Sequence, residues 1–134
     1  ANIANQLKGV RILLAEDNAF NAVVAREELE DAIEEVTVVV AENGAIAVEQ
    51  IIQNSFDLIL MDIQMPVMNG YEATKGIREL EDEKSKTPII AMTANVMKEE
   101  VDMCYKAGMN DFIGKPFETE ELIQKIYKQI HDQA

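Results

Sequence analysis

The chain has a single cysteine, Cys104, and no apolar run that approaches the roughly 18 residues of a membrane-spanning helix. One cysteine rules out an internal disulfide bond and fits a reducing compartment. Residues 1–8 also lack the basic and apolar regions of a signal peptide. We therefore expect a cytoplasmic protein, with no membrane contact by this segment.

Basic residues are scarce as well: 12 Lys and Arg stand against 25 Asp and Glu, and the formal net charge is −13 at pH 7. Docking on a phosphate backbone needs a basic patch, and the sequence contains no cluster of Lys and Arg. We therefore expect no nucleic-acid binding. An acidic surplus mostly serves solubility, but acids that converge on one place repel one another and need a reason.

Strand-like and helix-like segments alternate along the sequence. Five short apolar runs predict β-strands at 10–15, 36–40, 58–61, 89–92 and 111–113. Apolar residues at helical spacing follow each of them, and 79–87 reads as a loop or a frayed helix end. In the first helix we expect Phe20, Val23, Val24 and Leu29 to form the apolar stripe.

Strands this apolar need both faces covered, which predicts a parallel sheet with helices on each side. The expected fold is α/β: a doubly wound, flavodoxin-like (βα)5 arrangement with five parallel strands in the order 2-1-3-4-5. At 134 residues the chain is long enough for one domain with a single core. We expect one domain over 1–134, with 1–8 as an N-terminal extension and 9–131 as its core.

Residues that can carry chemistry stand at the carboxyl ends of four predicted strands. Glu16 and Asp17 close the first, Asp62 the third and Thr93 the fourth, while Lys115 follows the fifth. Open parallel sheets bind ligands at the carboxyl ends of their strands, near the point where the strand order reverses. In the order 2-1-3-4-5 the first and third strands are neighbours, which brings the three acids together.

Acids placed this closely predict a metal site. Two like charges about 4 Å apart repel by about 4 kcal/mol at an effective dielectric constant of about 20. A hard divalent cation removes this repulsion, and carboxylates, a backbone carbonyl and waters suit Mg²⁺. We predict that Glu16, Asp17, Asp62 and the backbone carbonyl of Gln64 hold Mg²⁺.

With the metal bound, Asp62 is a candidate nucleophile toward phosphorus, as in aspartyl-phosphate enzymes. The metal would draw off charge that builds on the transferring oxygens. Lys115 would pair with the acid before the reaction and with the phosphoryl oxygens afterwards. The Thr93 hydroxyl would donate a hydrogen bond to the same group.

Each of these residues also has a simpler interpretation. Glu16 and Asp17 can be the cap of the following helix, and Thr93 a cap or a β-branched strand residue. Lys115 can be a solvated surface lysine, and Asp62 a turn acid. The occurrence of all of them at strand ends on one edge of one sheet favours the phosphoryl-transfer site.

The sequence resembles the receiver domains of two-component response regulators, from residue 10 to the last helix. The motifs that carry the resemblance are 14–18 (LAEDN), 62–70 (DIQMPVMNG), 91–95 (AMTAN) and 114–117 (GKPF). These motifs are most similar to those of receiver domains fused to hybrid sensor histidine kinases. The resemblance implies that Asp62 accepts a phosphoryl group from a histidine kinase or a histidine phosphotransfer protein in a Mg²⁺-dependent reaction. It also implies that the domain catalyses the phosphorylation and dephosphorylation of its own aspartate. If the chain comes from a hybrid kinase, the domain is part of a histidine kinase.

The resemblance also implies a conformational switch formed by Thr93 and Phe112, although Phe112 can equally be an ordinary core aromatic. Residues 97–130 are expected to change most. The Lys115–Pro116 peptide bond should be cis, as it is in receivers. Two departures from the family pattern are small: Asn69 stands where Asp is frequent, and 31–36 lacks the glycine often found before the second strand.

Two other functions remain open. An aspartate-nucleophile phosphatase would carry a second acid two residues after Asp62, where this chain has Gln64. A degenerate receiver that serves only as a protein-binding module would have lost an acid, Thr93 or Lys115, and none is lost. A nucleotide-binding fold is disfavoured because no Gly-rich loop follows the first strand.

Overall fold

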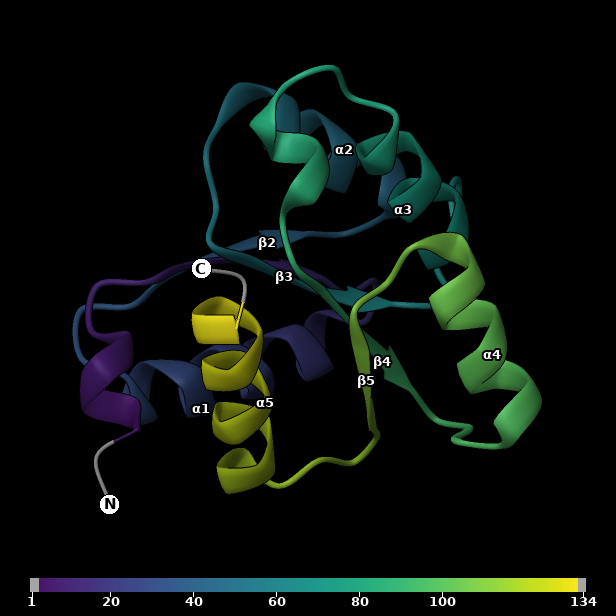
Figure 1. Cartoon of the computed structure of the whole chain (residues 1–134). Coiled ribbons are helices and arrows are strands. Elements are labelled where there is room, and N and C mark those ends of the chain that lie inside the picture. The colour runs from purple at the N-terminus through teal and green to yellow at the C-terminus, as the bar shows by residue number, and fades with distance from the viewer. Residues whose placement is uncertain (1–2, 133–134) are drawn as a thin grey trace.

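The computed structural model describes residues 3–132, so residues 1, 2, 133 and 134 of the predicted domain lie outside the described part. One parallel sheet has the strand order β2-β1-β3-β4-β5, as predicted (Figure 1). The strands are β1 (Arg11–Ala15), β2 (Thr37–Ala41), β3 (Leu58–Asp62), β4 (Ile89–Thr93) and β5 (Asp111–Gly114). Each boundary lies within one residue of its predicted position.

Residues 3–132 also form five α-helices and two short 3-10 helices. They are α1 (Ala19–Ala32), α2 (Gly44–Gln53), α3 (Gly70–Arg78), α4 (Lys98–Ala107), α5 (Thr119–Asp132), η1 (Ala4–Leu7) and η2 (Glu83–Lys86). The segment 79–87, predicted as a loop or frayed helix end, therefore contains a helical turn. Within residues 3–132, no helix is long and apolar enough to cross a membrane.

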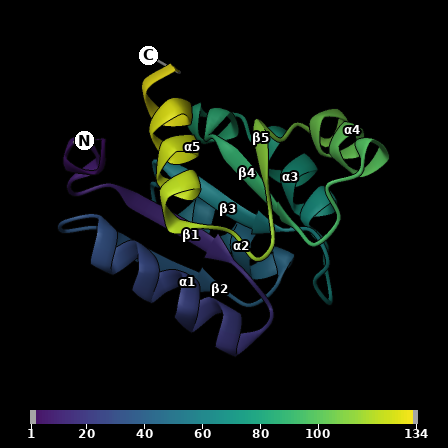
Figure 2. The same cartoon turned by 90° about the horizontal axis from the view of Figure 1, so that it is seen from below.

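The helices cover the sheet from both sides (Figure 2). Successive side chains of a strand point to opposite faces, so Leu14 packs with α1 and α5, whereas Leu13 packs with α2, α3 and α4. Leu7 of η1 is buried in the first of these clusters. Both faces of β1, β3 and β4 are therefore closed to water, and only their carboxyl ends remain available for chemistry.

The predicted apolar stripe of α1 is wrong for three of its four residues. Phe20, Val23 and Val24 are 74%, 53% and 37% exposed. The buried residues of this helix are Ala22, Ala25 and Leu29, because small side chains let it lie close to the sheet. Three apolar side chains of α1 thus face solvent.

The two departures from the family pattern have local explanations. Glu35 takes the left-handed backbone conformation (φ 61°) just before β2, which is the conformation a glycine would adopt most readily there. The Asn69 side chain accepts a hydrogen bond from the Glu72 backbone N–H, and Glu72 bonds back to Asn69, so the pair caps α3. Neither residue enters the candidate site.

Candidate functional site

Three acids meet at the carboxyl edge of the sheet, as predicted. One carboxylate oxygen each from Glu16, Asp17 and Asp62 lies within 4.8 Å of the others. The pairing of β1 with β3 brings the two strand ends together. Glu16 and Asp62 are buried and Asp17 is exposed, so the cluster is rigid on one side and open to solvent on the other.

These acids are not helix caps or turn residues. The cap of α1 is Asn18, whose side chain accepts a hydrogen bond from the Asn21 backbone N–H at 3.0 Å. Glu16 accepts from the Asn18 backbone N–H at 3.2 Å, and Asp62 is the last residue of β3. Behind it, a Cβ atom at Gly70 would collide with the Asp62 carbonyl oxygen, so only glycine allows α3 to begin there.

Lys115 lies inside the acid cluster. Its Nζ atom is 2.9 Å from Glu16 Oε1 and 3.1 Å from Asp62 Oδ2, and its side chain is 23% exposed. The interpretation as a solvated surface lysine is therefore wrong. The Lys115 backbone N–H donates to the Thr93 carbonyl at 2.7 Å, which fixes the end of β5 against β4. The Lys115–Pro116 bond is cis, in agreement with the resemblance.

The three charged side chains perturb one another. Burial, and then the adjacent Glu16 carboxylate, raise the pKa of Asp62 to about 6. Burial also acts to raise the pKa of Glu16, but hydrogen bonds from Lys115 and Asp62 hold it below its ordinary value. Burial acts to lower the pKa of Lys115, and the two carboxylates raise it. Lys115 acts to lower the pKa of Asp62 but does not offset the effects of burial and Glu16. A further positive charge in the cluster would therefore favour the ionised form of Asp62.

Thr93 and Gln64 line the same cavity, of about 340 Å³, which we call the acid pocket. The Thr93 hydroxyl does not reach Asp62: it donates to the Asn95 carbonyl and accepts from the Asn95 N–H, both at 2.9 Å. Phe112 lies away from the pocket, with its ring edge-on to Tyr105 at 6.4 Å between centroids.

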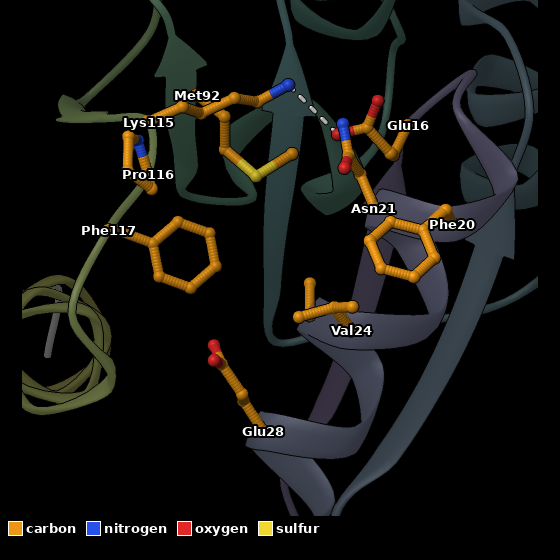
Figure 3. A pocket seen from close by; sticks show the side chains of 10 residues that line it. Glu16, Phe20, Asn21, Val24, Glu28, Met92, Lys115, Pro116 and Phe117 are labelled. Carbon is orange, nitrogen blue, oxygen red and sulfur yellow. Dashed lines mark hydrogen bonds and ion pairs between the residues drawn. The ribbon is translucent and has the colours of Figure 1, made fainter.

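Two features of the site were missed by sequence reasoning. Glu100, in the first turn of α4, also lines the acid pocket. It follows no strand, so nothing in its sequence position separates it from the many other acids of the chain. The second feature is a groove of about 360 Å³ beside the pocket, where Phe20 and Val24 of α1 lie across from Phe117 (Figure 3). We call it the α1 groove.

A family model described as the response regulator receiver domain matches residues 12–127. The chain is 41% identical to the sensor protein GacS of Pseudomonas syringae over 120 residues, which are 88% of this chain and 13% of GacS. It is 43% identical to the two-component response regulator ORR41 of Oryza sativa over 117 residues, 86% of this chain and 90% of that protein. The chain thus spans only a small part of the sensor protein but most of the rice regulator.

Two of the solved structures that share the fold are informative for this chain. One is the receiver domain of a sensor histidine kinase from Pseudomonas aeruginosa with magnesium in its active site cleft. Its TM-score is 0.84 at 38% identity, and 92% of this chain and 98% of that chain are covered. The other is the complex of the Saccharomyces cerevisiae histidine phosphotransfer protein Ypd1 with the Ssk1 receiver domain. Its TM-score is 0.85 at 29% identity, with coverage of 95% and 92%. The chain belongs to the response regulator receiver domain family.

Proposed function

We propose that this receiver domain transfers a phosphoryl group from a phosphohistidine to Asp62 and relays the signal by a change of conformation. The observation that carries the proposal is a buried carboxylate with a raised pKa that lies 3.1 Å from Lys115 at the edge of an open pocket. An Asp62 carboxylate oxygen would attack phosphorus, and the P–N bond to the imidazole would break. The electron pair of that bond would remain on the nitrogen of the donor histidine.

The donor set fits Mg²⁺. Three carboxylates converge within 4.8 Å, and the Gln64 carbonyl would complete the protein ligands. The similar receiver from Pseudomonas aeruginosa has a magnesium ion in its active site cleft, which supports the same ion here. When bound, Mg²⁺ offsets the charge of the acids and of the transferring oxygens.

Thr93 and Lys115 would bind the phosphoryl oxygens. Lys115 needs only to exchange its present partners for the new oxygens, since it already lies among the acids. Thr93 must first release Asn95, because its hydroxyl is fully engaged there. This exchange of partners would favour a second packing, in which we expect Phe112 to turn inward.

Incubation with acetyl phosphate and Mg²⁺ tests the proposal. We expect one added phosphoryl group by intact mass, absent without Mg²⁺ and absent in Asp62→Asn. The matched control is Asp57→Asn, which removes an exposed acid at the opposite end of β3 and should leave the adduct in place. An adduct on the Asp62→Asn variant, or none on a wild-type chain that binds Mg²⁺, would contradict the proposal.

Magnesium affinity should depend on pH. Metal binding needs ionised ligands, so protons compete with Mg²⁺ below the Asp62 pKa of about 6. We expect the affinity to be nearly constant above that pH and to fall by about tenfold per unit below it, as one proton is taken up. Calorimetric titrations over this range measure the effect. A flat profile through pH 6 in the wild type would contradict the raised pKa.

We further propose that the phosphohistidine donor docks on the α1 groove. The groove adjoins the acid pocket and shares Glu16 and Lys115 with it, so a protein seated there can reach Asp62. Its apolar side chains, Phe20 and Val24, are exposed and need a partner. The co-crystal structure of Ypd1 with the Ssk1 receiver supports a histidine phosphotransfer protein as this partner.

A reducing cytoplasm, where the buried Cys104 remains a thiol, fits such a relay.

Phe20→Ser should separate protein donors from small ones. Loss of an exposed aromatic anchor is expected to slow transfer from a phosphorylated histidine phosphotransfer protein about tenfold. The rate with acetyl phosphate should be unchanged, because the acid pocket is intact. Ile52→Ser is the matched control: this residue is 54% exposed, but it lies on α2, on the other face of the sheet. Equal slowing by both variants would place docking elsewhere.

The competing functions have less support. A phosphatase of the aspartate-nucleophile type needs a proton donor two residues after the nucleophile, and Gln64 cannot supply one. A receiver used purely for protein binding would not need the acids, Thr93 and Lys115 around one pocket. The complete set of side chains favours chemistry.

A further inference from the structure

The loop 63–69 follows the candidate phosphoacceptor and carries the Gln64 carbonyl, the proposed backbone ligand of Mg²⁺. Its tip is a three-residue turn: the Met68 N–H donates to the Pro66 carbonyl at 2.7 Å, and Val67 between them has a φ of 69°. A β-branched residue rarely adopts this left-handed conformation, so the turn is strained. Strained turns persist only where surrounding contacts hold them.

The contact that holds the tip comes from outside the loop, from the start of α2. The Gly44 N–H, at the first residue of α2, donates to the Met68 carbonyl at 3.0 Å. Gly44 is buried, and a Cβ atom there would collide with the same carbonyl oxygen. The Asn43 side chain fixes this end of α2, because it accepts a hydrogen bond from the Ile46 N–H at 2.9 Å. Only a glycine lets a fixed helix end lie this close to the loop.

The other end of the loop is closed from within, since the Gly70 N–H donates to the Ile63 carbonyl at 2.8 Å. The loop carbonyls at 63, 66 and 68 thus all accept hydrogen bonds. By contrast, no backbone N–H of residues 3–132 donates to the Gln64 carbonyl. Gln64 lines the acid pocket, so this carbonyl is available to a metal.

We propose that Gly44 is a positioning residue for the metal site: its contact with Met68 holds the strained loop, and the loop in turn holds the Gln64 carbonyl where it can bind Mg²⁺. The inference rests on the Mg²⁺ site of the proposed function. Groups that orient a metal ligand without touching the metal typically change metal affinity 10- to 100-fold when they are lost. Mg²⁺ is sensitive to such a change, because it requires a nearly ideal octahedral geometry.

Gly44→Ala tests the proposal, because the added methyl group must displace the Met68 carbonyl or the start of α2. We expect Mg²⁺ affinity to fall by about tenfold or more. Ca²⁺ affinity should fall by less than about threefold, since the three carboxylates remain and Ca²⁺ accepts a more flexible coordination. Calorimetric titrations measure both affinities, and circular dichroism establishes that the variant is folded. Equal losses for the two ions would mean general damage to the site and would overturn the proposal.

Two matched controls separate positioning from the effects of an added methyl group and of lost stability. Gly76→Ala adds a methyl group within α3, at an ordinary contact distance of 3.7 Å from Val48, and should leave both affinities unchanged. Arg78→Met removes hydrogen bonds at the end of α3 far from the acid pocket, and it should also leave them unchanged. If Arg78→Met lowered Mg²⁺ affinity as much as Gly44→Ala, affinity would follow stability and Gly44 would have no positioning role.

A measurement on the wild-type chain does not depend on whether Gly44→Ala folds. If the Gly44 contact favours Mg²⁺ binding, then Mg²⁺ binding must favour the contact equally. Saturating Mg²⁺ should therefore slow hydrogen exchange of the Gly44 N–H by at least about fivefold. The matched control is the Gly9 N–H, which donates to the Glu34 carbonyl, also at 3.0 Å, ahead of β1 at the opposite edge of the sheet. Its exchange should be unchanged, and equal slowing of both amides, or none at Gly44, would contradict the proposal.

The outcomes distinguish this inference from the proposed function. A wild-type chain that does not bind Mg²⁺ would overturn the proposed metal site, and the role of Gly44 with it. A wild-type chain that binds Mg²⁺, together with a folded Gly44→Ala variant that binds it equally well, would overturn only the role of Gly44. Asp62 would then remain the proposed phosphoacceptor.

Discussion

Lys115→Ala is expected to slow phosphorylation of Asp62 by roughly 10²- to 10³-fold, the usual cost of losing one preorganised group that stabilises developing charge. The Lys115 ammonium lies 3.1 Å from Asp62 and already holds the position from which it would contact the phosphoryl oxygens. It also lowers the pKa of Asp62, which is about 6 despite this help. Its loss would raise that pKa further, so a smaller fraction of Asp62 would be ionised near neutral pH.

The rate is measured as the growth of the phosphorylated mass with acetyl phosphate and saturating Mg²⁺. Lys125→Ala is the matched control, since this lysine has a similar exposure (24%) and pairs with Asp111 outside the acid pocket at 3.4 Å. The control should react at the wild-type rate. If both variants slowed equally, the effect would be one of general surface charge and the specific role of Lys115 would be wrong.

Arg78→Met is expected to lower the free energy of unfolding by about 3 kcal/mol, a large part of the 5–15 kcal/mol typical of domains. The half-buried guanidinium at the end of α3 donates four hydrogen bonds, to the carbonyls of Gly108, Ser85 and Thr87 and to Asn110 Oδ1. Bonds to charged groups contribute about 1.5–3 kcal/mol each. The cost of burying the charge offsets part of that sum, and burial also lowers the pKa of Arg78.

Urea unfolding at neutral pH measures this difference. Methionine keeps the aliphatic packing, so the loss reports on the guanidinium contacts that join α3 to the segments before β4 and β5. Arg26→Met is the matched control: Arg26 makes one exposed ion pair with Glu30 on α1, at 3.2 Å, and should change stability by less than about 0.5 kcal/mol. A loss below about 1 kcal/mol for Arg78→Met would mean that water replaces these bonds.

Much of the fold could be predicted from the sequence because its signals are local. Runs such as 58–61 are too apolar to be half-exposed, which determined the parallel sheet and the helices on both faces. The strand ends then placed Glu16, Asp17 and Asp62 together, since neighbouring parallel strands end at the same edge. The prediction of the acid cluster followed from topology and needed no side-chain detail.

Only the tertiary structure decided which side chains meet across elements. The apolar residues of α1 were predicted to be buried, but Ala22 and Ala25 pack on the sheet and Phe20 is left outside, because close approach of helix and sheet favours small side chains. Arg78 and its hydrogen-bond partners lie up to 32 residues apart along the chain.

The same holds for the polar groups at the site. The Thr93 hydroxyl donates to the Asn95 carbonyl in this structure, a contact that no sequence pattern indicated. The sequence by itself determined the strand–helix order, and from it the placement of the acids, since periodicity and strand ends are local properties. The orientation of each polar group depends on distant neighbours, so packing alone decided it.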